Sequence, residues 1–432
     1  MDCKYLLFHR IITKIGDRPP GVLMAKFDIK DAFRLIRVRV EDHHLLGLFF
    51  NGLYYYERCL PFGLKCSPAI FETFATAINL FITQEGVQSL DHYLDDFFLI
   101  TDETRALEEY NTTLATFNKL GVELAAEKLS PPCSRLEFLG IIIDTASMQA
   151  SLPEDKLVEY KKVISRWIKK PTGSLKQLQS LIGVLVYAAR IIQHGNTFYH
   201  HLIKHTNRIK SRGLKDVRLN QEAIEELHWW EYFIDKWNGS NIIPRSITHF
   251  PLSERHSLRT DACRTGMGAW FKDHQYALHA WSEEELKESY RDTDISMPYL
   301  ELLAILHAVN IWQKELAHCA IDLQSDCDPV VESINRGYSK QPDQHHLLRI
   351  LFFITSLNGI FISCSHIKGV DNDVADALSR AAHHDYKQQG KLLTDLFLSI
   401  PSVQAAHRGI HPVSRREIQP LPSENWKLLR KN

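Results

Sequence analysis

Aspartates stand at the ends of apolar, strand-like runs in two separate parts of this chain. Asp28 follows the run VLMAKF, and Asp95-Asp96 precedes the run FFLI. In the second half of the sequence, Asp261 follows HSLRT and Asp326 follows IDLQS. A strand buried on both faces is a short continuous apolar run, so an acid at its end lies at the rim of a core. The chain is therefore expected to form two strand-containing units, each with carboxylates at one edge of its strands.

The periodicity changes along the chain and predicts a multidomain protein of the α+β and α/β classes. Residues 1–145 mix strand-like runs with helical stretches, and 152–243 is helical. Within that helical stretch, Ser174-Leu175-Lys176-Gln177 has the spacing of a capping box, which predicts a helix start. After Pro244, strands and helices alternate as in a second α/β unit. Beyond Asp385 the chain is rich in Gln, Pro, Ser and His, which favours a poorly ordered tail.

Composition excludes several classes of protein. The eight cysteines lie far apart and never form a C-x-x-C pair. This pattern disfavours a zinc framework or a disulfide scaffold and favours an intracellular setting, cytoplasmic or nuclear. The N-terminus has charges among its apolar residues and no small-residue cleavage site, so a secreted protein is not expected. The longest apolar stretch, near 350–364, is interrupted by polar residues and is too short to cross a bilayer.

The formal net charge is -1, yet positive charge is concentrated in one segment. Residues 151–215 contain 13 Lys and Arg and three acids, a balance of +10. A solvated helix face is the usual interpretation of a single run of charge. This larger imbalance favours a surface that grips nucleic-acid phosphates and binds them more weakly as salt rises.

Five short motifs follow one another in the first 145 residues. They are FDIKDAF (27–33), LPFGLKCSPAIFE (60–72), YLDD (93–96), GVELAAEK (121–128) and FLG (138–140). In this order and at these spacings they resemble the palm motifs of retroelement reverse transcriptases. A lone pair of aspartates more often caps a helix or lies in a solvated turn. The five motifs together favour the resemblance over that interpretation.

The resemblance implies a polymerase site built on aspartates. Asp28 and Asp95 would be metal-binding carboxylates, and Asp96 would be the second Asp of the motif. Carboxylates at strand ends repel one another unless a cation lies between them, and Mg²⁺ prefers such oxygen ligands. In the family, two Mg²⁺ (or Mn²⁺) ions serve each site. One activates the primer 3′-hydroxyl, and the other stabilises the triphosphate and the leaving pyrophosphate.

The same resemblance implies residues that contact nucleotide and primer. Phe33 would lie beside the nucleotide sugar and select deoxynucleotides, and a plain core aromatic is an equally good interpretation. Lys128 would donate a proton to pyrophosphate, whereas an exposed lysine is more often simply solvated. The other implied contacts are Pro61, Phe62 and Gly63 for nucleotide and template, and Phe138, Leu139 and Gly140 for the primer.

Only 27 residues precede Asp28, fewer than the family's fingers region, so truncated fingers are expected. Lys4, Arg10, Lys14 and Arg18 are candidates for the phosphate clamp of the fingers by charge only. Each charge-assisted hydrogen bond missing from such a clamp would cost about 1.5–3 kcal/mol. Weakened polymerisation is therefore one expectation for this chain.

A second set of acids follows strands or starts helices after Pro244: Asp261, Glu301, Asp326 and Asp376. Such positions can face one cleft, where two divalent ions would activate water and polarise a phosphodiester. The segments TDACRTGMGAWF, YLELLAI, QSDCDPVVESINRG and HIKGVDNDVADALSR resemble, in order, the ribonuclease H domain that follows the polymerase in retroelements. The resemblance implies that the four acids bind metal, that His366 helps to release product and that Asn372 contacts substrate. A lone histidine at a strand end is more often structural, and only the spacing from His366 to Asp376 favours the functional interpretation.

The resemblance predicts four regions. They are a reverse-transcriptase palm with partial fingers at 1–145, a helical thumb and connection at 146–250, a ribonuclease H-like domain at 251–385 and a disordered tail at 386–432. The motifs look closest to DIRS-like retrotransposons, which use a tyrosine recombinase, and next to Ty3-like elements.

The implied function is RNA-directed DNA polymerisation coupled to cleavage of RNA in RNA·DNA hybrids. Its partners would be an RNA template, a DNA primer, the hybrid and deoxynucleoside triphosphates, together with other retroelement proteins. The alternative is a truncated or co-opted fragment that binds nucleic acid without polymerising, with or without nuclease activity.

Three further patterns are interpreted as structural. His201 and His205 are four residues apart on an expected helix, but no Glu and no third ligand accompany them in the sequence, which disfavours a metal site. His346-Leu347-Leu348-Arg349 mimics the H-x-x-R pattern of recombinases and is expected on the outer face of a helix. Gly266-Met267-Gly268 is expected to form a turn between strands.

Overall fold

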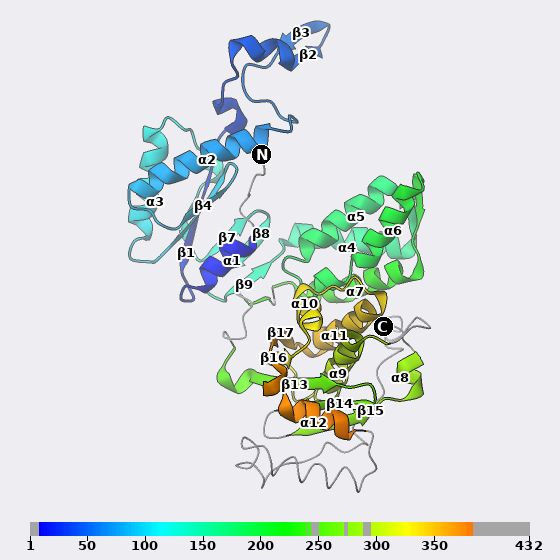
Figure 1. The fold of residues 1–432 in the computed structure, drawn as a ribbon. Coiled ribbons are helices and arrows are strands. Elements are labelled where there is room, and N and C mark those ends of the chain that lie inside the picture. Colours follow the sequence, from blue (N-terminus) through cyan, green and yellow to red (C-terminus); the bar gives the residue numbers. More distant parts are fainter. Residues whose placement is uncertain (1–7, 240, 243–249, 272–274, 288–294, 383–432) are drawn as a thin grey trace. The chain divides into compact units, whose positions relative to one another are not determined.

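The computed structural model describes residues 8–239, 241–242, 250–271, 275–287 and 295–382. The chain forms two compact units (Figure 1). The first comprises Met1–Leu157 with Asn238–Pro244, and the second comprises Val158–Trp237 with Arg245–Asn432. The tail expected at 386–432 lies outside the described residues.

A four-stranded antiparallel sheet forms the centre of the first unit. Its order is β4-β5-β1-β6. The strands are β1 (Leu23–Asp28), β4 (Leu90–Tyr93), β5 (Asp96–Thr101) and β6 (Ser130–Cys133). Helices α2 (Ser67–Gln84) and α3 (Ala106–Lys119) supply core residues against one face of this sheet (Figure 1).

Alternation along β1 separates the core of the first unit from its acidic edge. Phe27 packs against Phe117 of α3, with ring centroids 6.0 Å apart. Successive side chains of a strand point to opposite faces, so Lys26 and Asp28 lie on the face away from α3. Asp28 is paired in register with Asp96 of β5. A register slip of one residue would turn these acids into the core, so burial of Phe27 fixes where they lie.

Several smaller elements complete the first unit. A second four-stranded sheet has the order β12-β9-β8-β7, and a two-stranded hairpin pairs β2 with β3. All residues of β2 and β3 are exposed. The elements are α1 (Phe8–Gly16), β2 (Gly47–Phe50), β3 (Leu53–Tyr56), β7 (Arg135–Phe138), β8 (Ile141–Asp144), β9 (Gln149–Ser151) and β12 (Asn241–Ile242), with 3₁₀ turns η1 (Ala32–Leu35), η2 (Val40–Leu46) and η3 (Ala126–Lys128).

The second unit begins with helices. These are α5 (Leu175–Ala188), α6 (His200–Ser211) and α7 (Gln221–Trp237), preceded by α4 (Glu154–Lys169) and joined by the short strand pair β10 (Thr172–Ser174) and β11 (Asp216–Arg218). The predicted capping box is confirmed, because Ser174 and Gln177 bond to each other's backbone N–H at the start of α5. Trp229, Trp230 and Phe233 of α7 are buried, and the indole of Trp230 donates to the carbonyl of Phe198.

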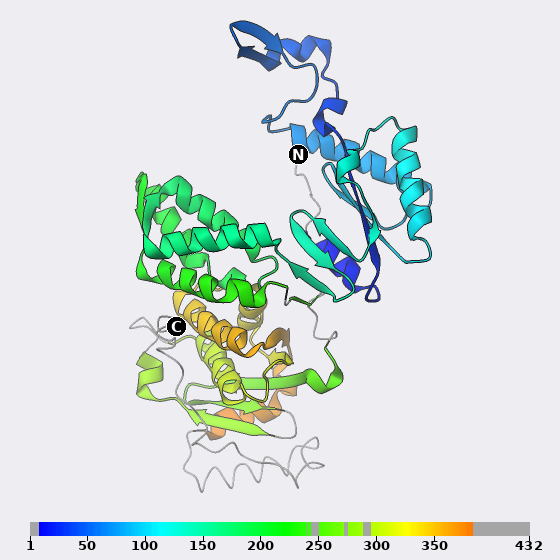
Figure 2. The ribbon, with the colours of Figure 1, turned by 180° about the vertical axis from the view of Figure 1, so that it is seen from behind.

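A mixed five-stranded sheet forms the rest of the second unit, in the order β15-β14-β13-β16-β17. The first three strands pair antiparallel, and β16 and β17 run parallel to β13. The strands are β13 (Arg255–Ala262), β14 (Gly266–Trp270), β15 (Tyr276–Ala280), β16 (Ala320–Ser325) and β17 (Phe361–His366). The helices are α8 (Glu283–Lys287), α9 (Met297–Ile311), α10 (Asp328–Arg336), α11 (Pro342–Asn358) and α12 (Asp373–Ala381). Helices α9 and α11 lie on one face of this sheet and α12 lies on the other (Figures 1 and 2).

Gly266 and Gly268 lie within strand β14, so the predicted turn at 266–268 is wrong. Both residues are buried where α12 packs on the sheet. A Cβ atom at position 268 would overlap the carbonyl oxygen of Ala375 and lie 2.5 Å from the backbone nitrogen of Ser379. Helix α12 can therefore pack this closely on β14 only because residues 266 and 268 are glycines.

Gly268→Ala should displace α12 and lower the free energy of unfolding of the second unit. The methyl group meets backbone atoms that cannot rotate away, and such overpacking costs about 1–3 kcal/mol or more. The measurement is urea denaturation followed by tryptophan fluorescence. Gly183→Ala is the control, because Gly183 is exposed in helix α5 and its Cβ would meet no atom within 4 Å. That change should be neutral or stabilising, and equal destabilisation by both variants would contradict the packing argument.

Candidate active sites

Three aspartates meet at one end of the sheet in the first unit. Asp28 ends β1, and its partner in register is Asp96, the first residue of β5. Asp95 lies in the tight turn between β4 and β5, where Leu94 has a positive φ of 56°. The carbonyl of Asp95 accepts a hydrogen bond of 3.1 Å from the N–H of Ile29. The hairpin thereby holds Asp95 beside the end of β1.

Two lysines partly neutralise these aspartates. Lys128 Nζ lies 2.9 Å from Asp28 Oδ1, and Lys26 Nζ lies 3.1 Å from Asp96 Oδ1. Burial raises the pKa of Asp95 and of Asp96. When all are ionised, the three aspartates carry one more charge than the two lysines can balance. The remaining negative charge favours binding of a cation.

The residues predicted to contact nucleotide lie in η1 and in the loop that precedes α2. The ring of Phe33 packs between Phe62 and Phe71, with centroids 5.2 and 5.5 Å away. Phe62 is 74% exposed, and Gly63 beside it is in the left-handed region at φ 84°. The carbonyl of Pro61 accepts from Ser67 Oγ at 2.7 Å. The exposed ring of Phe62 therefore lies beside the half-buried ring of Phe33.

The implied primer contacts form the turn between β7 and β8. Phe138 is buried and packs on Phe98 of β5, with centroids 4.6 Å apart. Leu139 and Gly140 both have positive φ, and the carbonyl of Gly140 accepts from Lys156 Nζ. Phe98 lies on the same sheet face as Asp96, so the turn that contacts Phe98 is on the face of the sheet that carries Asp96.

Three acids converge in the second unit. Asp261 comes from β13, Glu301 from α9, and Asp326 directly follows β16. Each can offer a carboxylate oxygen within 4.8 Å of the others. Asp261 and Glu301 are buried, and the inward oxygen Oε2 of Glu301 has no hydrogen-bond partner among the described residues.

The electrostatics of this acidic group favour a cation. Burial, reinforced by Asp261 and Asp326, raises the pKa of Glu301 to about 9. Burial likewise raises the pKa of Asp261 to about 6, against a hydrogen bond of 2.6 Å from Ser379 Oγ that lowers it. Buried carboxylates that repel one another and retain an unpaired oxygen fit the oxygen-ligand preference of Mg²⁺.

The other residues predicted for this site lie around the acidic group. Asp376 of α12 raises the pKa of Asp261, but its own carboxylate accepts two hydrogen bonds from Arg380. His366 ends β17, is partly exposed and lies 3.6 Å from Asp328. Asn372 is buried, and its amide donates to the carbonyl of Thr260 next to Asp261. The roles of these residues stay predictions.

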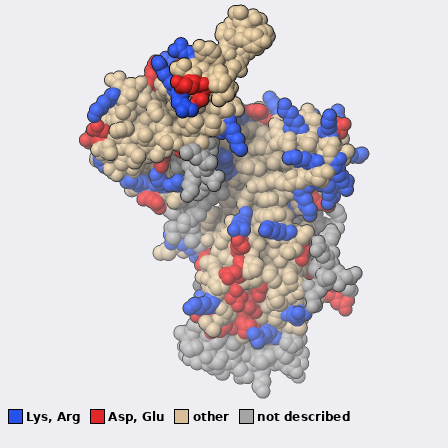
Figure 3. All heavy atoms as spheres, turned by 45° about the horizontal axis from the view of Figure 1, so that its top comes forward, with Lys and Arg blue, Asp and Glu red and all other residues tan. Residues whose placement is uncertain are grey.

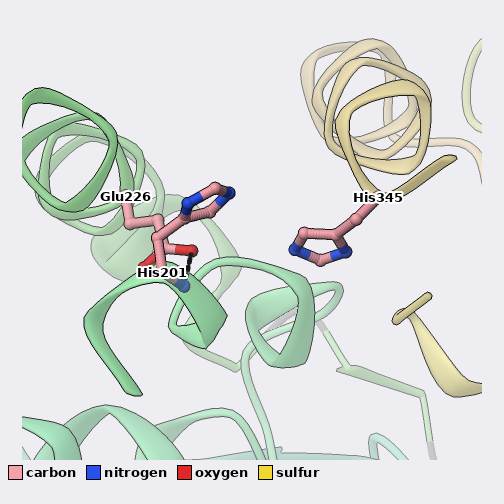
Figure 4. A group of neighbouring side chains, drawn as sticks. All are labelled: His201, Glu226 and His345. Atoms are coloured by element: carbon pink, nitrogen blue, oxygen red, sulfur yellow. Dashed lines mark hydrogen bonds between the residues drawn. The ribbon is translucent and has the colours of Figure 1, made fainter. Parts of the chain in front are cut away.

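A separate group of histidine and glutamate side chains lies in the second unit. His201 of α6, Glu226 of α7 and His345 of α11 approach one another, with His345 facing the other two across the gap between helices (Figure 4). Glu226 is fully buried and accepts from the N–H groups of His201 and Leu202 at the start of α6. The premise that no Glu and no third ligand accompany His201 is therefore wrong. His205 instead bonds the carbonyl of Arg218.

Arg349 supplies the positive charge beside this group. Its guanidinium lies 3.5 Å from His201 Nε2 and 3.7 Å from Glu225. Arg349 is 3% exposed, so the expectation that 346–349 forms the outer face of a helix is wrong for Arg349. A buried arginine is tolerated because acidic groups on α7 face it.

Acidification should destabilise the second unit through the two histidines of this group and through His200, whose ring centroid lies 5.4 Å from that of His345. Burial lowers the pKa of His200 to about 4, of His201 to about 3 and of His345 to about 2. Each ring is neutral when folded but takes up a proton near pH 6.5 when unfolded, so its stabilising contribution is complete above about pH 6.5 and lost as the pH falls. Burial raises the pKa of Glu226 to about 7, which opposes one of these contributions. These four groups should together contribute a loss of at most about 3 kcal/mol per pH unit between about pH 6 and 4.5, and the raised pKa values of Glu301 and Asp261 in the same unit reduce the net slope.

This pH dependence can be measured by urea denaturation at several pH values. Tryptophan fluorescence reports on the second unit, because all eight tryptophans lie in its sequence range. The variant His345→Gln should show a shallower slope, whereas His205→Gln should keep the slope of the wild type. A wild-type slope in His345→Gln would contradict the assignment.

Lysine and arginine gather over the helical part of the second unit (Figure 3). This is the segment of residues 151–215 with a charge balance of +10. Acidic side chains form a separate group over the sheet-containing part (Figure 3). None of the helices in the described ranges combines the length and hydropathy needed to cross a membrane.

Residues 10–143 match the family model described as "Reverse transcriptase (RNA-dependent DNA polymerase)". This part of the chain, which has a mixed α/β structure, is similar to reverse transcriptases, and it contains Asp28, Asp95 and Asp96. Outside these residues, the similarity to known proteins continues over most of the chain.

The relatives are polyproteins of a virus and of retrotransposons. "Polyprotein P3" of Commelina yellow mottle virus is 25% identical over 392 residues, which cover 86% of this chain and 19% of that protein. "Transposon Tf2-3 polyprotein" of Schizosaccharomyces pombe is 24% identical over 389 residues, which cover 87% of this chain and 26% of that protein. The chain thus spans about a fifth to a quarter of the length of these curated relatives.

Solved structures of the foamy viral protease-reverse transcriptase also resemble the chain. The complex of its dRH form with double-stranded DNA has a TM-score of 0.48 and 15% identity, covering 85% of this chain and 60% of that one. The complex with an RNA/DNA hybrid has a TM-score of 0.46 and 16% identity, covering 85% and 46%.

The sequence interpretation missed several groups that hold the acids in place. Lys26 lies two residues before Asp28, so strand alternation could have predicted that it shares the acidic face. Arg380 lies four residues after Asp376 in one helix, a spacing at which ion pairs form. No local signal pointed to Ser379 as the hydrogen-bond donor to Asp261.

Proposed function

We propose that this chain is the RNA-directed DNA polymerase of a retroelement, coupled to a ribonuclease H activity on RNA·DNA hybrids. The observation that carries the first activity is the similarity of residues 10–143 to reverse transcriptases, with Asp28, Asp95 and Asp96 together at the end of the sheet. The second activity rests on the convergence of Asp261, Glu301 and Asp326. The relatives support a retroelement origin, and we place the chain nearest DIRS-like elements, with Ty3-like elements second.

In the polymerase, Asp28 and Asp95, with Asp96, would hold Mg²⁺. When bound, Mg²⁺ supplies the Lewis acid that makes a hydroxyl or water nucleophilic and neutralises phosphate charge. Lys128 is paired with Asp28 in a half-exposed position, from which its ammonium group could pass a proton to a departing pyrophosphate. Phe33 and the Pro61-Phe62-Gly63 loop would position the deoxynucleoside triphosphate and template, and Leu139 and Gly140 the primer.

In the nuclease, Asp261, Glu301 and Asp326 would hold Mg²⁺, with Asp376 at their edge. Ser379 fixes one oxygen of Asp261, and the N–H of Ala262 fixes one oxygen of Glu301, so the free oxygens are oriented before any ion binds. His366 is partly exposed at the strand end beside Asp328, where it could accept or give a proton as product leaves. Asn372 is buried and its amide nitrogen is bonded to Thr260, so the predicted contact with substrate would require its side chain to become exposed.

The test is to incubate the purified chain with Mg²⁺ and two labelled substrates. One is an RNA·DNA hybrid, whose RNA strand should be cut. The other is a DNA primer on an RNA template, which should be extended when deoxynucleoside triphosphates are added. A hybrid left intact at saturating protein would refute the nuclease assignment.

A nuclease without polymerase activity is the second candidate. It is favoured by the ion pairs of the first unit, because Asp28 and Asp96 are each held by a lysine. In contrast, no ion pair joins Asp261, Glu301 or Asp326 to a lysine or arginine within the described ranges. Cleavage of the hybrid without primer extension would favour this candidate.

A further inference from the structure

A second histidine and glutamate group lies beside the mixed sheet of the second unit and belongs to neither acidic site. His279 comes from β15, Glu285 from the short helix α8, and His307 from α9. Each can offer a ligand atom within 4.8 Å of the other two. Their side chains are 25%, 19% and 3% exposed, so the group is mostly buried.

The Nε2 atom of each histidine points toward the carboxylate of Glu285. His279 Nε2 lies 3.0 Å from each oxygen of Glu285, and His307 Nε2 lies 2.9 Å from Oε1. His307 is buried, and its Nε2 is paired with Glu285, whereas its Nδ1 has no hydrogen-bond partner in the part of the chain that is described. The two Nε2 atoms and the Glu285 carboxylate are therefore close enough together to coordinate a single ion.

We propose that His279, Glu285 and His307 bind a Zn²⁺ ion, with water as a fourth ligand. Two imidazole nitrogens and one carboxylate are a ligand set that zinc prefers. Ligand atoms bound at about 2.0–2.2 Å in a tetrahedron lie roughly 3.4 Å apart. This is a few tenths of an ångström more than the 3.0 and 2.9 Å that separate His279 Nε2 and His307 Nε2 from the Glu285 carboxylate.

The surrounding hydrogen bonds orient the carboxylate. The N–H of Ser282 donates to Glu285 Oε2 at 2.7 Å, and Ser282 Oγ accepts from the N–H of Glu285. This reciprocal pair fixes the start of α8 and leaves the other lone pairs of Glu285 for the ion. The role we infer is structural, because the ion would tie β15 and α8 to the helix that carries Glu301.

Charge distinguishes this group from the one formed by His201, Glu226 and His345. There, the guanidinium of Arg349 already lies beside the histidine, and a divalent ion would be repelled. Among the described residues, Glu285 has no ion pair with a lysine or arginine. We therefore expect zinc at the group that contains Glu285 and not at the group that contains Glu226, which serves as a matched control.

The experiment measures metal content, so it does not depend on the proposed catalytic activities. The full chain is stripped with a chelator, dialysed against ZnCl₂ and gel-filtered, and zinc is measured by mass spectrometry. The wild type should retain about one equivalent. His279→Gln and Glu285→Gln should lose it, with affinity reduced by more than the roughly 10–100-fold that removal of an outer-shell partner costs. His279 is the more exposed histidine, and far-UV circular dichroism would verify that both variants fold.

Two control variants locate the ion. His201→Gln and Asp326→Asn should retain zinc as the wild type does. Co²⁺ in place of zinc should give the absorption of a four-coordinate ion in the wild type and not in His279→Gln. Absence of retained zinc, or its loss in either control variant but not in His279→Gln, would overturn the proposal.

Discussion

Replacement of Asp326 by Asn should abolish cleavage of the RNA strand of an RNA·DNA hybrid, with a fall in rate of at least about 10³-fold. Asp326 supplies one of three carboxylates that converge within 4.8 Å. The amide has nearly the same shape but no negative charge, so it cannot offset the charge of a divalent ion as the carboxylate does. The measurement is the initial rate of cleavage of a labelled hybrid in the presence of Mg²⁺.

The control for this change is Glu332→Gln in α10. Glu332 is exposed and forms a surface ion pair with Arg336, an interaction worth about 0–1 kcal/mol. Its removal should leave the cleavage rate within about twofold of the wild type. If Asp326→Asn still cuts at the wild-type rate, the three acids are not the nuclease site, whatever else the protein binds.

Replacement of Asp95 by Asn should eliminate extension of a DNA primer on an RNA template, again by at least about 10³-fold. Asp95 lies in the hairpin turn beside Asp28, and burial raises its pKa. The change to Asn removes the negative charge of Asp95, which is one of the two carboxylates, with Asp28, that we assign to Mg²⁺ binding. Hybrid cleavage in the same preparation should continue, because the nuclease acids lie in the other unit.

Asp102→Asn is the matched control for the polymerase. Asp102 directly follows β5, at the opposite end of the strand from Asp95, and forms a partly exposed pair with Arg18. Extension by this variant should equal that of the wild type. Extension that persists in Asp95→Asn would instead indicate a contaminating polymerase or a different catalytic residue.

Local patterns predicted the elements well where short-range chemistry determines them. The capping box at Ser174 needed only four residues to specify a helix start. The apolar run before Asp28 predicted a buried strand, and β1 ends at that aspartate. Acids at such ends could be foreseen because the strand itself fixes their position at the rim of a core.

Contacts between distant residues could not be predicted in this way. Glu226 bonds the N–H of His201 from 25 positions away, and Arg349 approaches His201 from 148 positions away. The glycines of β14 have the local appearance of a turn, and only the later packing of α12 explains why a side chain is excluded there. These features depend on how helices pack, which one sequence without a fold does not specify.

The hydrogen bond between Ser379 and Asp261 also affects the order in which parts of the second unit fold during synthesis. It joins positions 118 residues apart, and α12 is the last helix of the described chain. Contacts of such long sequence separation form late, since the entropy of loop closure must be overcome first. During synthesis, β13, α9 and β16 emerge from the ribosome before the residue that fixes the first carboxylate. We therefore expect a nascent chain to complete the group of acids proposed as the nuclease centre only after α12 has emerged and docked on β14.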